Sequence, residues 1–100
     1  MSKPAAPGLV SSTVTGSNQF TPWLKLEQLE RAAVSVAGTG FVGTVTFERR
    51  LDSINARGVK QWTADAEETF EADTACEIRA GVRTGDYTSG SVALLLKKGA

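Results

Sequence analysis

Residues 41–50 read FVGTVTFERR, and their alternation is the clearest structural signal in the chain. Odd-numbered positions carry Phe41, Val45 and Phe47, whereas even-numbered positions from residue 44 onward are polar. β-Branched and aromatic residues that recur with a period of two are typical of a half-buried strand. This pattern therefore predicts a β-protein organised around the strand. The Gly-Thr-Gly sequence of residues 38–40 predicts a turn immediately before it.

The closing stretch, residues 75–98, repeats the alternation on both sides of a glycine-rich turn at residues 84–90. Every second residue of the stretch is apolar and is predicted to face the core: Cys76, Ile78, Ala80, Val82, Val92, Leu94 and Leu96. Lys97 and Lys98 follow the last strand, where charge discourages further pairing.

Two further segments are typical of strands. Residues 9–15 predict a first, edge strand, and residues 59–63 return from a loop at 51–58 with Trp62 as an anchor in the core. About seven or eight short strands separated by turn signals predict an all-β, antiparallel β-sandwich, Ig-like or jelly-roll-like. We expect residues 9–100 to form this single domain and residues 1–8 to form an extended N-terminal arm.

Two segments leave alternatives open. Residues 22–31 fit a helix that starts at Thr21-Pro22, but two strands joined around residues 28–31 are the preferred interpretation. The acidic residues 64–74 fit a short helix, a strand centred on Phe70 or a loop, with Phe70 in the core in each case.

Composition excludes several classes of function. The 11 basic residues balance the 11 acidic ones, which argues against a nucleic-acid partner. The absence of histidine excludes Ser-His or Cys-His nucleophiles and zinc sites of the common Cys/His kinds. Cys76 is the only cysteine and is interpreted as a small buried hydrophobe. No signal peptide or bilayer-spanning run is recognisable, so we expect a soluble cytosolic product unless it leaves in a larger assembly.

Two groups of residues are candidate binding sites. The acidic residues Asp65, Glu67, Glu68, Glu71 and Asp73 lack the central glycine of an EF-hand loop and predict a solvated acidic face. The aromatic residues Trp23, Trp62 and Tyr87 would suit stacking on a carbohydrate, but two tryptophans in a thin domain are more often core or interface anchors. We expect no catalytic residue, cofactor or metal.

Residues 43–52 (GTVTFERRLD), Trp62-Thr63 and residues 78–92 (IRAGVRTGDYTSGSV) resemble a pattern in small structural proteins of tailed bacteriophages. Those proteins share a "GTVT…R…D…W" hairpin and an "R.GV.TG.YTSG.V" ending. The chain departs from the usual tight Asp-Gly-Gly turn, because Asp52 is followed by the longer loop of residues 53–58. The resemblance covers roughly the last 60 residues.

The resemblance implies a non-enzymatic virion protein, made in the cytoplasm of the bacterial host: a capsid decoration or cement protein that bridges capsid subunits. A tail or collar adaptor and a carbohydrate-binding module for host attachment are the alternatives. The expected partners are the major capsid protein or other virion subunits and further copies of the chain, with a trimer as one form, and neither nucleic acid nor membrane. We expect the interface to include the arm, the first strand and two loops: Pro4, Pro7, Leu9, Val10, Asn55, Arg57, Asp86 and Tyr87.

Overall fold

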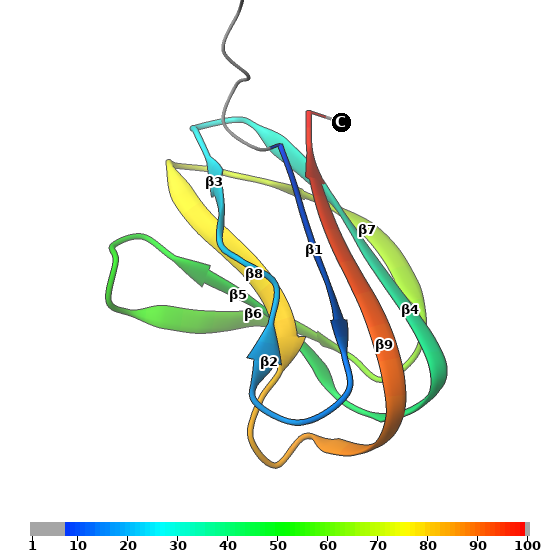
Figure 1. The fold of residues 1–100 in the computed structure, drawn as a ribbon. Coiled ribbons are helices and arrows are strands. Elements are labelled where there is room, and N and C mark those ends of the chain that lie inside the picture. Colours follow the sequence, from blue (N-terminus) through cyan, green and yellow to red (C-terminus); the bar gives the residue numbers. More distant parts are fainter. Residues whose placement is uncertain (1–7, 100) are drawn as a thin grey trace, which may run out of the picture.

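The structure of the chain is a computed structural model that describes residues 8–99. These residues form nine strands and no helix, and the strands make two antiparallel sheets around one shared core (Figure 1). The predicted all-β class and antiparallel pairing are therefore confirmed. A search of the same residues for a helix long and apolar enough to cross a membrane finds none.

The first sheet has the strand order β1-β9-β4-β7 and consists of β1 (Leu9–Val14), β4 (Arg31–Gly43), β7 (Ala66–Glu71) and β9 (Tyr87–Lys98). The second has the order β2-β8-β5-β6, with β3 also paired to β8, and consists of β2 (Gln19–Phe20), β3 (Leu24–Leu26), β5 (Val45–Arg50), β6 (Ala56–Trp62) and β8 (Cys76–Val82). β1 lies at an edge, as predicted for residues 9–15.

The core lies between the sheets and is filled from both of them. All seven apolar residues predicted to face inward from the closing stretch are buried, because successive side chains of a strand point to opposite faces. Aromatic rings fill the side bounded by β6 and β7: the ring of Phe47 lies 6.1 Å from that of Trp62 and 5.2 Å from that of Phe70. The core position predicted for Trp62 is confirmed, whereas Phe70 is half-buried and packs against the core.

The prediction of one continuous strand over residues 41–50 was wrong, and so was the turn at residues 38–40. β4 continues through those glycines with irregular pairing, and the chain changes sheets at Thr44. Gly43 permits this change, because a Cβ atom at that position would lie 2.4 Å from the carbonyl oxygen of Asp86. The Thr44 amide donates to the same oxygen at 2.9 Å. Phe41 thus remains half-buried, while Phe47 enters the core.

Residues 22–31 form strands and a turn, as preferred from the sequence. Leu24 and Leu26 of β3 are buried and Lys25 between them is exposed, so the segment follows the two-residue period of a strand. The turn that follows places Leu29 in the left-handed region, with φ of 69°. Tertiary pairing with β8 therefore outweighs the local helix signals.

The remaining differences concern where elements begin. The acidic segment forms a strand, β7, which is one of the three alternatives left open. Both predicted loops are shorter than expected, since β6 begins at Ala56 and β9 at Tyr87. β2, which has only two residues, was not predicted from the sequence.

Gly81 makes room for β2 on the second sheet. It is the pairing partner of Phe20, and a Cβ atom at Gly81 would lie 2.2 Å from Cδ2 of the Phe20 ring and 2.4 Å from the Gln19 carbonyl oxygen. The ring of Phe20 and the backbone of β2 thus occupy the space that a side chain would need.

We therefore expect Gly81→Ala to lower the free energy of unfolding by about 1–3 kcal/mol, because Phe20 and β2 would have to move. Urea denaturation would measure the change. Gly8→Ala is the matched control, since its nearest contact would be an ordinary 3.8 Å to Cβ of Lys98. Equal stability of the two variants would contradict the close packing described for Gly81.

Candidate binding surface on the β5–β6 hairpin

The hairpin formed by β5 and β6 extends away from the two-sheet body (Figure 1). Residues 51–60 are all exposed. Among them are three of the six large apolar side chains that are exposed in residues 8–99: Leu51, Ile54 and Val59, at 63, 82 and 50%. Leu51 and Val59 also line a hollow of about 470 Å³ together with Arg49 and Arg57. We call residues 51–59, the outer half of the hairpin, the hairpin tip.

Asp52 shapes the turn of the hairpin tip. Its Oδ1 accepts hydrogen bonds from the amides of Ile54 and Asn55 at 2.8 and 2.7 Å, and its Oδ2 accepts one from the Asn55 side chain at 3.1 Å. The bonds from Asn55 and Ile54 hold the pKa of Asp52 below its usual range. A carboxylate with several donors favours one conformation of this turn, in which the Ile54 side chain is exposed to solvent.

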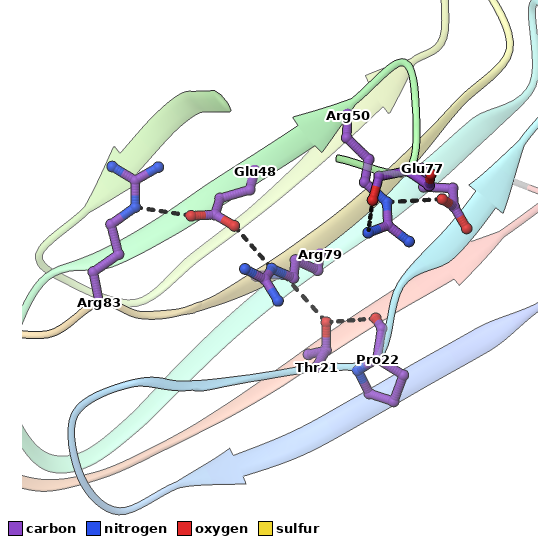
Figure 2. Close-up of polar contacts among 9 residues, drawn as sticks. Thr21, Pro22, Glu48, Arg50, Glu77, Arg79 and Arg83 are labelled. Atoms are coloured by element: carbon purple, nitrogen blue, oxygen red, sulfur yellow. Dashed lines mark hydrogen bonds and ion pairs between the residues drawn. The ribbon is translucent and has the colours of Figure 1, made fainter. Parts of the chain in front are cut away.

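The base of the hairpin is fixed by Glu48, which is buried in spite of its charge. Its Oε1 accepts from Nε of Arg79 and its Oε2 from Nε of Arg83, both at 2.8 Å (Figure 2). Both arginines come from the β8 side of β5, so a single carboxylate is bound by two cations. Two charge-assisted hydrogen bonds offset the cost of removing Glu48 from water.

Arg50 holds the hairpin at a second point. Its Nε donates to Oε1 of Glu77 on β8 at 2.8 Å, and its guanidinium lies 4.1 Å from the centre of the Trp23 ring (Figure 2 shows the Arg50–Glu77 pair). The guanidinium of Arg79 lies 4.5 Å from the same ring and 3.9 Å from that of Phe20. Cations and aromatic rings thus alternate along the outer face of the second sheet.

Arg49 points to the opposite face of β5 and bonds to Asp73 at 3.1 Å. Three consecutive residues of β5 therefore tie the hairpin to its surroundings through ion pairs. The hairpin tip carries apolar groups on a base whose position is fixed.

The predicted interface residues lie in four places. Leu9 is 46% exposed at the edge strand β1, whereas Val10 of the same strand is buried and points to the core. Asn55 and Arg57 are exposed on the hairpin tip, although Asn55 also holds Asp52. Asp86 and Tyr87 are half-buried near Thr44 and Phe41. Pro4 and Pro7, and residues 1–7 of the predicted arm, lie outside the described residues.

The three aromatic residues considered for carbohydrate have separate contacts. Trp62 is buried and its Nε1 donates to Glu68 at 3.0 Å. The guanidinium groups of Arg50 and Arg79 lie over the ring of Trp23. Tyr87 packs beside Phe41. Only Trp23 and Tyr87 are thus partly exposed for stacking on a ligand.

Four of the five acidic residues of segment 65–73 (Asp65, Glu68, Glu71 and Asp73) have separate polar partners and do not form one cluster. Asp65 accepts from the Gly38 amide at 2.9 Å. Lys60 and Trp62 bond to Glu68 and lower its pKa. No group of three or more His, Cys, Asp or Glu side chains in residues 8–99 is arranged to hold a metal ion. Cys76 is buried, and burial raises the pKa of its thiol, as expected of a small hydrophobe.

Sequence patterns alone did not single out Glu48 or the apolar hairpin tip. A half-buried strand implied water on the side of Glu48, because charged residues are normally exposed. The available signal was the presence of Arg79 and Arg83 on one face of another predicted strand, where they can meet an acidic residue on a neighbouring strand.

Comparison of the chain with protein-family models, with curated proteins and with solved structures found no match.

We expect Glu48→Gln to lower the free energy of unfolding by about 1–3 kcal/mol, because the two arginines lose their charged acceptor. Chemical denaturation would measure this loss. Glu77→Gln is the matched control: its pair with Arg50 is more exposed, so the change should stay below about 1 kcal/mol. Equal effects of the two substitutions would contradict the role given to Glu48.

The Asp52 turn makes a separate prediction about pH. Because the pKa of Asp52 is lowered in the folded chain, its stabilisation is present above the ordinary aspartate pKa and is lost as pH falls through the lowered value. In an NMR titration, the amide resonances of Ile54 and Asn55 should shift at a pH below the usual aspartate range. The same resonances in Asp52→Asn should lack this transition. A transition at or above the usual range would contradict the assigned hydrogen bonds.

Proposed function

We propose that the chain is a non-enzymatic structural protein of a phage virion, a decoration or cement subunit that binds to the assembled head and bridges capsid subunits. The observation that carries the proposal is the hairpin tip, where Ile54 is 82% exposed, on a base fixed by Glu48 and Arg50. Exposed apolar groups on a fixed projection favour docking to another protein surface.

The chemistry of the hairpin tip indicates what the docking surface offers. Burial of one large aliphatic side chain contributes about 1.5–3 kcal/mol, so the three exposed apolar residues can supply a useful part of a binding energy. Arg49 and Arg57 are directly opposite on β5 and β6, where like charges repel. Arg57 is exposed, and residues 8–99 contain no ion pair to it. An apolar surface that also carries a carboxylate would complement both features.

The virion setting rests on the resemblance of residues 43–52, Trp62-Thr63 and residues 78–92 to phage structural proteins. These residues include β5 and the end of β6, whereas the loop of residues 53–58 departs from the tight turn of those proteins. Where one molecule makes two contacts with the shell, one through the hairpin tip and one through the arm, the second contact is intramolecular and strengthens attachment. The proposal extends to the fold and the chain terminus: the two sheets form a β-sandwich of Ig-like or jelly-roll-like type, and residues 1–8 act as an arm on a neighbouring subunit.

The test is binding of the purified protein to heads of the encoding phage that were assembled without it. Ile54→Asp should weaken binding at least about tenfold, because docking would bury a charge without a partner. Leu29→Asp is the matched control, since Leu29 is also exposed, at 68%, but lies outside the hairpin.

Sedimentation of heads with bound protein, at a series of protein concentrations, gives the affinities. No binding by the unaltered chain would overturn the proposed function. Full binding by Ile54→Asp would overturn only the role of the hairpin tip.

A further inference from the structure

The four outer edges of the two sheets differ in how they discourage pairing with another strand. β6 contains an irregularity at Val59 and carries Arg57 and Lys60. β7 carries three glutamates. At the remaining edge of the second sheet, Pro22 lies between β2 and β3. Bulges, charges and prolines are the devices by which proteins protect exposed strand edges.

β1 has none of these devices. Its sequence, LVSSTV, contains no charge and no proline, and its residues are uncharged β-formers or serines. It pairs with β9 in an unbroken register, from Leu9 opposite Lys97 to Val14 opposite Val92. Within residues 8–99, β9 is its only pairing partner (Figure 1 shows β1 in blue beside β9). An unprotected edge of this kind is ready to accept a further strand.

The ladder with β9 determines which backbone groups are available. The Lys98 amide donates to the Gly8 carbonyl oxygen at 2.6 Å, so Gly8 directs its polar groups toward β9. Because this direction alternates along an antiparallel strand, Leu9, Ser11 and Thr13 direct their N–H and C=O groups toward the free edge. All three residues are exposed.

We propose that β1 pairs with β1 of a second copy of the chain, antiparallel, with a two-fold axis at Ser11. In this register Ser11 lies opposite Ser11 of the second copy, and Leu9 lies opposite its Thr13. Each of these pairs exchanges two backbone hydrogen bonds. The first sheets of the two copies join into one continuous sheet, and a two-fold contact closes on two copies rather than the trimer considered from the sequence.

Charge selects a second copy of β1 as the occupant. When β1 pairs with itself, Leu9, Ser11 and Thr13 face the same three residues of the second copy. All three are uncharged, so the two strands do not repel each other. Self-pairing of β6 would bring arginine and lysine together, and self-pairing of β7 would bring glutamates together. Leu9, which is 46% exposed, gains a neighbour in Thr13 of the second copy.

The residue on the two-fold axis permits a specific test. Ser11→Lys places two lysines face to face, and Ser11→Glu places two glutamates face to face, so each variant alone should dimerise at least about tenfold more weakly than the unaltered chain. An equimolar mixture of the two variants places lysine opposite glutamate and should restore the dimer. Analytical ultracentrifugation would distinguish it from the 10.5 kDa single chain by its doubled mass.

Ser17→Lys is the matched control, because Ser17 is exposed in the turn after β1 and should leave the dimer intact. Ser11→Pro is a second blocking variant: its lost N–H points to the free edge, so the β1–β9 ladder is spared. Circular dichroism confirms that each variant is folded. A monomeric unaltered chain at about 100 μM, a dimeric Ser11→Pro, or a mixture of lysine and glutamate variants that stays monomeric would each overturn the proposal.

Discussion

The carboxylate of Glu48 is the group on which the arrangement of the second sheet depends. β5 is a central strand of that sheet, and Val45 and Phe47 bury one of its faces in the core. Glu48 is buried on the other face, where an uncompensated charge would be strongly destabilising. Arg79 and Arg83 bind both oxygens of the carboxylate, and this requirement fixes β8 beside β5 in one register.

The same arginines extend this constraint to the rest of the sheet. Arg79 stacks on Phe20 and Trp23, so the cation that neutralises Glu48 also positions β2 and the bend before β3. Gly81 leaves the space in which Phe20 lies. Polar contacts on the outer face therefore complement the apolar core in selecting one arrangement, and they hold the base of the hairpin where the core no longer reaches it.

The sequence was most informative where a strand has one face in the core and the other in water. The alternation in β8 and the second half of β9 identified every inward residue correctly, because a period of two is a local property. It failed at residues 41–50, where the chain changes sheets at Thr44: the contact between Gly43 and Asp86 joins residues 43 positions apart, and no local pattern reports it. Glu48 was placed in water for a similar reason, since its burial depends on arginines from another strand. The inward direction of Val10 was likewise not evident from the sequence, because LVSSTV is a short and weakly alternating strand.

The hairpin tip and the free edge of β1 lie on opposite sides of the two-sheet body, and this placement connects the two proposals. β6 borders β7, since Lys60 and Trp62 of β6 bond to Glu68, whereas β1 is at the other end of the first sheet. Pairing through β1 therefore leaves the hairpin tip of each copy free. A dimer with two such tips is bivalent, and the second contact then forms at the effective concentration set by the dimer itself rather than by the solution. The joined first sheets would hold the two bodies in one arrangement, so the separation of the tips, which belong to the second sheets, would be set by the dimer, and only surfaces that repeat at a matching distance would gain from both contacts. A regular protein shell offers such repetition, and an isolated subunit does not.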